Sequence, residues 1–363
     1  MGQRTKQVLL TAVVGVFVIG FALILWRGPW WFDGAHLRSK NLEPADGVVI
    51  TGFRTTLVGL GVGAVAAVGL LYTHWTLTHT REKDRAQVEL AREGQVTEHY
   101  VEAIKLLASD NLTQRLGGIY SLERIMRDSE KDHATVVDVL GAFVRQHAVQ
   151  IDENEPDDQN KKPAEDVQAA VTVLGRRPTG AAQSQLINLN HTDLRGANLS
   201  NGNFSRVDFR GAWLQRSYLA RSTLIGALLD RSALHKADFM FTDLTDTSFY
   251  QANMEEAALW QAYARGAIFS YARMRQVNLR EAKLQQAAFI GARMPFASLH
   301  GADLENAVLD DADLSQAEGL EVAQLTAAQL SATSKLPSGL VGDPDIQAAT
   351  RRFTGRAAQA EGA

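Results

Sequence analysis

The stretch ANLSNGNFSRVDFRGAWLQ, residues 197–215, repeats one pattern every five residues. In each unit a large apolar residue follows a small residue by two positions, and the intervening residue is mostly polar. The large residues here are Leu199, Phe204, Phe209 and Leu214. A period of five matches neither the 3.6-residue period of a helix nor the two-residue period of a strand. The pattern therefore predicts a solenoid in which every repeat makes the same turn.

The register of this repeat holds without insertion or deletion from Leu189 to Leu314. It gives 26 central positions, of which 25 are Leu, Phe or Met, and the exception is Ala264. The position two residues earlier is Ala in 16 of the 26 repeats. We therefore expect both positions to face a narrow interior that only a small residue beside each large one can fill.

Individual units carry a resemblance to a known family. The units TDLRG at 192–196, ANLSN at 197–201 and ADLEN at 302–306 resemble the A-(D/N)-L-x-x unit of the pentapeptide-repeat family. This resemblance implies a right-handed, four-sided β-helix with one repeat on each side and four repeats in each coil. Residues 20 apart should then stack, and Met254, Met274 and Met294 fall into one such column. With strands about 4.8 Å apart, the rod is roughly 30 Å long.

The resemblance extends to the region before the repeats. The segments RLGGIYSLERI at 115–125, VLGAFVR at 139–145 and DVQAA at 166–170 resemble the helical segment that precedes the repeats in bacterial membrane-anchored members of this family. The fold class expected is thus an all-β solenoid, preceded by a small α-helical module and two transmembrane helices.

Two uncharged stretches near the N-terminus predict the two spans. Residues 8–26 and 55–75 contain 19 and 21 residues without Asp, Glu, Lys or Arg, and a helix of about 20 apolar residues crosses a bilayer. Aromatic residues suited to the lipid–water interface cluster at the end of each span, namely Trp26, Trp30 and Trp31 for the first and Tyr72 and Trp75 for the second. Residues 1–79 are therefore expected to form a hairpin in the lipid bilayer. A cleaved signal peptide is the alternative for the first stretch, but no Ala-x-Ala site follows it.

The distribution of basic residues suggests an orientation for the hairpin. Six Lys and Arg residues flank the two spans on the outside of the hairpin, and four lie in the connecting loop. The positive-inside rule then favours cytoplasmic N- and C-termini in a multi-pass protein of a bacterial inner membrane.

Small residues recur on the second span at Gly59, Gly63 and Ala67. Such spacing lets two helices approach closely in lipid. The first span, through Thr11 and Gly15, is one candidate neighbour. A second copy of the chain is the other, which would make a homo-oligomer.

The remaining boundaries follow from composition and periodicity. Amphipathic stripes predict a helical module over 80–149, with Ser109 or Asp110 capping one helix and a capping box at Thr135 and Asp138 for another. The other expected segments are an acidic linker at 150–166, an N-terminal cap at 167–186, the β-helix at 187–318, a C-terminal cap at 319–337 and a disordered tail at 338–363. A spacer is the expected role of the linker, with an acidic partner-binding segment as the alternative.

The sequence offers no catalytic, cofactor-binding or metal-binding constellation. It has no cysteine, and its nine histidines form neither an HExxH motif nor a close set with carboxylates. No phosphate-binding loop or nucleophile-elbow motif is present. We therefore expect a protein that is not an enzyme and has no cofactor. An enzyme or metal protein with an unrecognised site is an alternative.

The charge of the rod and of the whole chain bears on two further functions, DNA mimicry and nucleic-acid binding. Some family members resemble B-form DNA and bind DNA gyrase, which requires a strongly acidic rod. Residues 187–316 hold 14 acidic and 13 basic side chains, and the whole chain has a formal charge of −4. A DNA-mimicking topoisomerase-binding protein is therefore the alternative rather than the expectation, and a nucleic-acid partner is not expected.

Large side chains at outward positions predict a partner site. Met240, Phe241, Trp260 and Tyr263 should lie together at one corner of the rod, beside a dent left by the small side chain of Ala264. Exposed aromatic residues are enriched at binding hot spots. Packing among themselves and on neighbouring Arg stems is the alternative. The sequence thus predicts a membrane-anchored, non-catalytic scaffold that binds an unknown protein partner.

Overall fold

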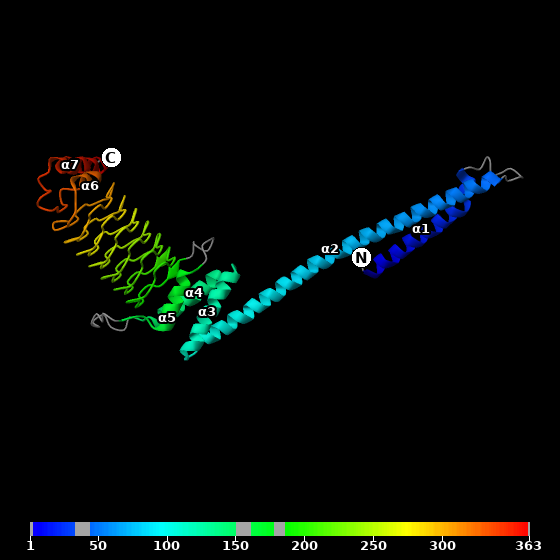
Figure 1. The fold of residues 1–363 in the computed structure, drawn as a ribbon, viewed down its shortest axis with the longest axis horizontal. Helices are drawn as coiled ribbons and strands as arrows, with labels where there is room; N and C mark the ends of the chain where they lie inside the picture. Colours follow the sequence, from blue (N-terminus) through cyan, green and yellow to red (C-terminus); the bar gives the residue numbers. More distant parts are fainter. Residues whose placement is uncertain (1–2, 33–43, 150–160, 178–185, 362–363) are drawn as a thin grey trace. The chain divides into compact units, whose positions relative to one another are not determined.

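The computed structural model describes residues 3–32, 44–149, 161–177 and 186–361 (Figure 1). The chain divides into two compact units, residues 1–93 and 94–363. The first unit contains helix α1, Gln3–Phe32, and most of helix α2, Pro44–Leu107, which run antiparallel (Figure 1). They touch where the ring of Phe21 lies over Gly61, since a Cβ atom at Gly61 would stand 2.6 Å from Phe21 Cζ.

Apolar side chains cover the outside of these helices. Among the described residues, one helical segment, Arg54–Leu77, is long and apolar enough to cross a membrane, and Val14–Gly28 is a shorter apolar segment. None of the hydrophobic window of Arg54–Leu77 is buried within the protein. The second predicted span therefore has the required length, whereas the first stays a prediction.

The second unit begins with the end of α2 and three shorter helices: α3 Leu112–Asp128, α4 His133–His147 and α5 Glu165–Gly175. The N-cap of α3 is Asn111, whose side chain accepts a hydrogen bond from Gln114 N at 3.3 Å, so the predicted caps Ser109 and Asp110 are wrong. The N-cap of α4 is Asp132. This helix starts before the predicted capping box at Thr135 and Asp138, which lies within its first two turns.

These helices pack into one layer. Gly118 lets α3 approach α2 closely, because a Cβ atom there would lie 2.7 Å from Leu107 N. Arg115 Nε donates to Asp166 Oδ2 at 2.6 Å and ties α3 to α5. Asp166 is buried and lies in the first turn of α5, so the predicted solvated linker ends before residue 166. Residues 150–160 of that predicted linker lie outside the described residues.

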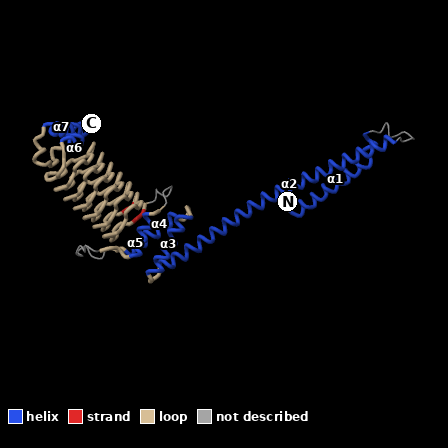
Figure 2. The backbone as a smooth tube through the Cα atoms, in the orientation of Figure 1, coloured by secondary structure: helices blue, strands red, loops and turns tan. Residues whose placement is uncertain are grey.

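The repeats form a β-helix. Strands β1, Ile187–Asn188, and β2, Val207–Asp208, pair in parallel, and single bridges between residues 20 apart continue this pairing as far as Ser298 and Glu318. Four repeats therefore complete one coil. Each wall carries only one or two residues in strand geometry per coil, so Figure 2 draws almost the whole rod as loop. All 26 central residues of the repeats are buried.

The four walls are named here by their first central residues: wall 1 by Leu189, wall 2 by Leu194, wall 3 by Leu199 and wall 4 by Phe204. Inside wall 1, the rings of Phe249, Phe269 and Phe289 stack with centroid separations of 5.1 and 4.9 Å. Ala264, on wall 4, is fully buried. The dent expected beside this residue stays a prediction.

The helical layer closes the N-terminal end of the rod wall by wall. Arg145 Nη1 donates to Asn188 O on wall 1, and Ala148 O accepts from Asp193 N on wall 2. On wall 3 the side-chain amide of Gln168 bonds both the N–H and the C=O of Asn198. On wall 4 Gly175 O and the Arg177 guanidinium bond Asn203. These bonds occupy backbone groups that would otherwise form an open sheet edge.

The C-terminal end is covered by helix α6, Val322–Ala327, and helix α7, Pro344–Glu361. Residues 308 and 313 bridge to 329 and 335, which adds a last partial layer to the sheet. Helix α7 corrects the prediction that 338–363 is disordered. Asp343 Oδ1 accepts from the N–H groups of Asp345 and Ile346 and caps this helix, while the Ile346 side chain is buried.

Candidate interaction surfaces of the β-helix

The predicted patch is partly assembled in the structure. The rings of Phe241 and Trp260 meet edge to face at a centroid separation of 5.0 Å. The guanidinium of Arg221 lies 5.6 Å from the Phe241 ring, in cation–π geometry. Met240, Phe241 and Trp260 are half-buried, so the alternative of mutual packing with Arg stems holds in part.

Tyr263 lies apart from the two rings. It stands on wall 4, where the sheet places it between Asp243 and Lys283, and 58% of its surface is exposed. No ring contact joins Tyr263 to Phe241 or Trp260 among the described residues. The four residues therefore span two walls of the rod around one corner, with Tyr263 as the exposed member.

The corners impose a backbone constraint on some of these side chains. The last residue of most repeats has a left-handed backbone, and φ is 60° at Phe241, Tyr271 and Phe296. A glycine takes this conformation without strain, as Gly226 does at φ 63°. For a bulky residue it is unfavourable by about 1–2 kcal/mol. The same backbone occurs at this position in most repeats, so it is a property of the coil, and the three aromatic residues share its cost with the Arg, Gln and Glu residues found there.

A second surface, on wall 1, was not predicted from the sequence. Seven consecutive outward positions of this wall carry no charged side chain. They are Ser248, Tyr250, Ile268, Ser270, Ala288, Ile290 and Val308. Tyr271, at the adjoining corner, contacts Tyr250 with a ring separation of 5.8 Å. Aligning the outward positions in columns of 20 would have found this uncharged row.

The uncharged row of wall 1 is bounded by two acidic residues on the same wall. Asp230 precedes it and Asp310 follows it. Ile268 and Tyr271 are 40% and 52% exposed, respectively. The row mixes these apolar side chains with Ser248 and Ser270, and exposed apolar residues that cluster mark a binding site more often than isolated ones do.

The ionisable groups near the first coils stabilise the fold. Burial alone would raise the pKa of Asp193, but hydrogen bonds from Arg195 outweigh burial and hold this pKa below its usual range. The same balance, with Arg210 as the donor, lowers the pKa of Asp208. Burial lowers the pKa of Arg177 to about 10, so its guanidinium stays protonated at neutral pH and donates to the first coil.

The described side chains offer little for catalysis. Within the described ranges, no group of three His, Asp or Glu side chains could hold a metal ion. The lowered pKa values of Asp193 and Asp208 belong to carboxylates paired with arginine, and that of Asp313 comes from hydrogen bonds of Ser315 and from Lys335 at the other end of the rod. The apolar outer surfaces are accordingly the more distinctive features of the β-helix.

The predicted small-residue stripe on α2 does not contact α1. Gly59 and Gly63 have open space where a Cβ atom would stand, and Ala67 is exposed. The same is true of Gly15 on α1. It is Gly61, between the two predicted glycines, that faces α1. Packing of this stripe against a second copy stays a prediction.

Comparison with known protein families identifies the type of repeat. The family described as pentapeptide repeats matches overlapping segments that together cover residues 187–316, with eight copies. No curated protein matches the chain.

Solved structures of repeat proteins align with part of the chain. HetL, from the cyanobacterium Nostoc, is 27% identical over 39% of this chain and 82% of its own, with a TM-score of 0.18. QnrB1, a plasmid-mediated fluoroquinolone resistance protein, is 17% identical over 47% of this chain and 89% of its own, with a TM-score of 0.23. A pentapeptide repeat protein of the Arabidopsis thaliana thylakoid lumen is 22% identical over 44% and 88%, with a TM-score of 0.16.

Proposed function

Residues 187–316 make this chain a member of the pentapeptide-repeat family. From this premise we propose that the chain is a non-catalytic scaffold that holds a protein partner on its β-helix. We further propose that a two-helix hairpin anchors it in a membrane. The observation that carries the proposal is the uncharged row on wall 1. A rigid wall with exposed Ile and Tyr can bury apolar surface against a partner without desolvating a charge.

The corner residues support the same function. Phe241 and Trp260 present an aromatic pair one wall removed from Tyr263. Aromatic anchors of this kind dominate the energy of many interfaces. The near-neutral charge of the rod gives no reason to prefer a DNA-mimicking role, which needs an acidic surface.

The membrane part of the proposal is supported by the hairpin. Val65 and Leu70 on α2 are each 73% exposed. Helices covered with apolar side chains are stable in lipid, where their backbone groups are already satisfied. Arg54–Leu77 has the length of a span.

A paired set of variants tests the partner surface. Ile268→Asp with Ile290→Asp would place two charges on wall 1, and Asn278→Asp with Ser298→Asp would place two on wall 3 in the same coils. A photo-crosslinking residue at Tyr271 should capture one protein in the wild type and in the wall 3 variant, and lose it in the wall 1 variant. Equal capture by all three would refute wall 1 as the partner surface.

Topology is tested separately. The chain has no cysteine, so single cysteines at Ser39 and Ser338 can be labelled on intact cells with an impermeant maleimide. We expect labelling at residue 39 and not at 338. Labelling at 338 would place the C-terminus outside and overturn the proposed orientation.

A further inference from the structure

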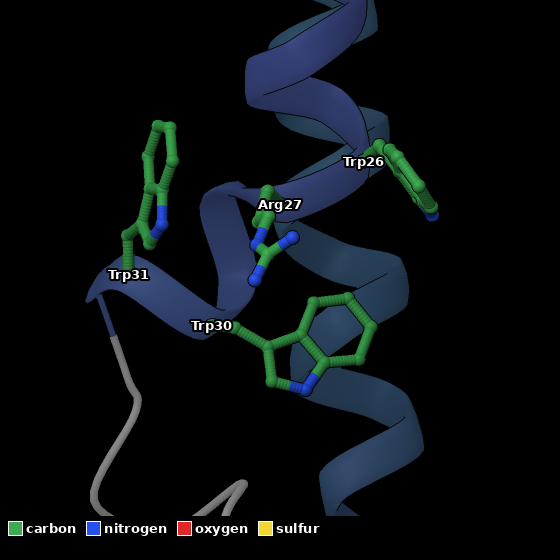
Figure 3. Close-up of a pocket in the computed structure, with 4 residues that line it drawn as sticks. All are labelled: Trp26, Arg27, Trp30 and Trp31. Atoms are coloured by element: carbon green, nitrogen blue, oxygen red, sulfur yellow. The ribbon is translucent and has the colours of Figure 1, made fainter.

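One end of the hairpin gathers two arginines and three tryptophans. Near the end of α1, Trp26, Arg27, Trp30 and Trp31 line a cavity of about 390 Å³. Figure 3 shows Arg27 lying among the three indole rings, with α2 passing behind them. Tryptophan at a helix end suits the lipid–water interface, and an arginine beside it can extend its guanidinium to the level of the headgroups.

The second arginine comes from α2 at the same level. The contact of Phe21 with Gly61 fixes the antiparallel register of the two helices. Arg27 lies six residues beyond Phe21, and Arg54 lies seven residues before Gly61. At 1.5 Å per residue these positions are about 9 and 10.5 Å from the contact in the same direction, so the two arginines stand at almost one height. Gly28, the residue after Arg27, is buried.

Neither arginine has a counter-ion among the described residues. The Nε atom of Arg54 is buried and has no hydrogen-bond partner. Arg27 forms no ion pair, hydrogen bond or ring contact with any described residue. A buried donor without a partner is unfavourable, and the penalty is greater for a charged group. Arg27 is exposed, whereas this atom of Arg54 is buried, so the two guanidinium groups at one level offer an anion one accessible charge and one buried donor without a partner.

We propose that Arg27 and Arg54 bind the phosphodiester of an anionic lipid headgroup, with the indole rings of Trp26, Trp30 and Trp31 packed around it. Guanidinium groups match phosphate oxygens in a bidentate geometry, and being weakly hydrated they are suited to a partly dry site. The indole rings would lie along the glycerol region of the lipid. This inference rests on the proposed membrane anchoring of the hairpin.

Acidic residues near the same end provide the competing explanation. Asp33, Glu43 and Asp46 are close in sequence, and their side chains lie outside the description. If they paired with the arginines, lipid charge would not matter. The experiment therefore has to separate internal pairing from a lipid.

Native mass spectrometry of the full chain, extracted from vesicles of equal parts phosphatidylcholine and phosphatidylglycerol, makes this separation. The wild type should retain phosphatidylglycerol over phosphatidylcholine by about 30-fold, since each of two basic side chains near an anionic surface contributes about 1 kcal/mol. Arg27→Gln with Arg54→Gln should reduce the preference to less than about twofold. The matched control, Arg280→Gln with Arg293→Gln, removes the same charge from the β-helix and should retain the wild-type preference.

The outcomes are distinguishable. Addition of inorganic phosphate should leave the retained lipid in place, and displacement by free phosphate would show a site for a soluble anion instead. A wild type without lipid preference, or a double variant with an unchanged preference, would overturn the headgroup site. Flotation of the wild type with vesicles after an alkaline wash tests the anchor by itself. A chain that does not float would refute the proposed membrane function, whereas one that floats without lipid preference would refute only this site.

Discussion

The hairpin and the β-helix place the same kinds of residue on opposite sides. In the β-helix, Phe269 is fully buried among stacked rings, and the outward positions are small, polar or charged over most of the surface. In the hairpin, Phe17 and Leu70 are 68% and 73% exposed, and Phe21 on Gly61 is one point at which the two helices meet. The β-helix thus has its own apolar interior, whereas the hairpin requires an apolar environment outside.

The largest expected difference comes from removing one phenylalanine on each side. Phe269→Ala should lower the free energy of unfolding of the β-helix by about 3–5 kcal/mol, because it leaves a cavity between Phe249 and Phe289. Phe17→Ala should change it by less than about 0.5 kcal/mol, since the side chain contributes nothing to that core. Thermal unfolding in detergent, followed by circular dichroism, measures both. Equal losses would mean that the two units share one core.

The next comparison lies within the second unit, between a buried and an exposed ion pair. Arg115→Met leaves Asp166 buried without its partner and should cost about 3 kcal/mol. Arg273→Met breaks the pair with Glu255 on the rod surface and should cost less than about 1 kcal/mol. Denaturant unfolding of both variants gives the values. A small effect of Arg115→Met would show that the helical layer does not contribute to the stability of the coils.

The predictive power of the sequence also differs between these regions. The β-helix was predictable in detail because every coil repeats the same local steric requirement, so the register from Leu189 to Leu314 follows by counting. The helical layer was predicted as elements but not as an end cap. Its bonds to the first coil, such as those of Gln168 to Asn198, join residues 30 apart that share no period.

The outer surfaces show the same limit. The patch at Phe241 and Trp260 was predicted because aromatic residues are conspicuous in the sequence. The row on wall 1 was missed because Ile268 and Ile290 become neighbours only when outward positions are aligned by coil. The helix α7 was missed because Ala, Gly and polar residues predominate there, and only the buried Ile346 and the cap at Asp343 fix it.

Lowering the pH tests how much Asp193 and Asp208 contribute to the stability of the N-terminal end of the rod. The folded-state pKa values of Asp193 and Asp208 lie below their usual range, because arginine bonds outweigh the opposing effect of burial. Ionisation of these groups therefore contributes stability above the unfolded pKa of about 3.9, and this stability is lost as pH falls through the folded values. The variant Asp193→Asn with Asp208→Asn should lose less melting temperature than the wild type between pH 6 and pH 3. Parallel pH profiles for the two proteins would contradict the assignment.

The smallest expected effect on stability concerns Phe241, an apolar side chain that is partly exposed on the β-helix as apolar side chains are on the hairpin. Phe241→Gly removes a ring that contacts Trp260 and Arg221, a loss of about 1 kcal/mol. It also relieves the left-handed backbone at φ 60°, a gain of about 1 kcal/mol, so the net change should be near zero. Phe241→Ala loses the ring without this relief and should be less stable than Phe241→Gly by about 1 kcal/mol, the reverse of the usual order of Ala and Gly.

Both variants should weaken partner capture equally if the ring serves binding. If capture instead followed stability, with Gly retaining what Ala loses, the aromatic corner would be a packing feature, and wall 1 alone would be left as the partner surface.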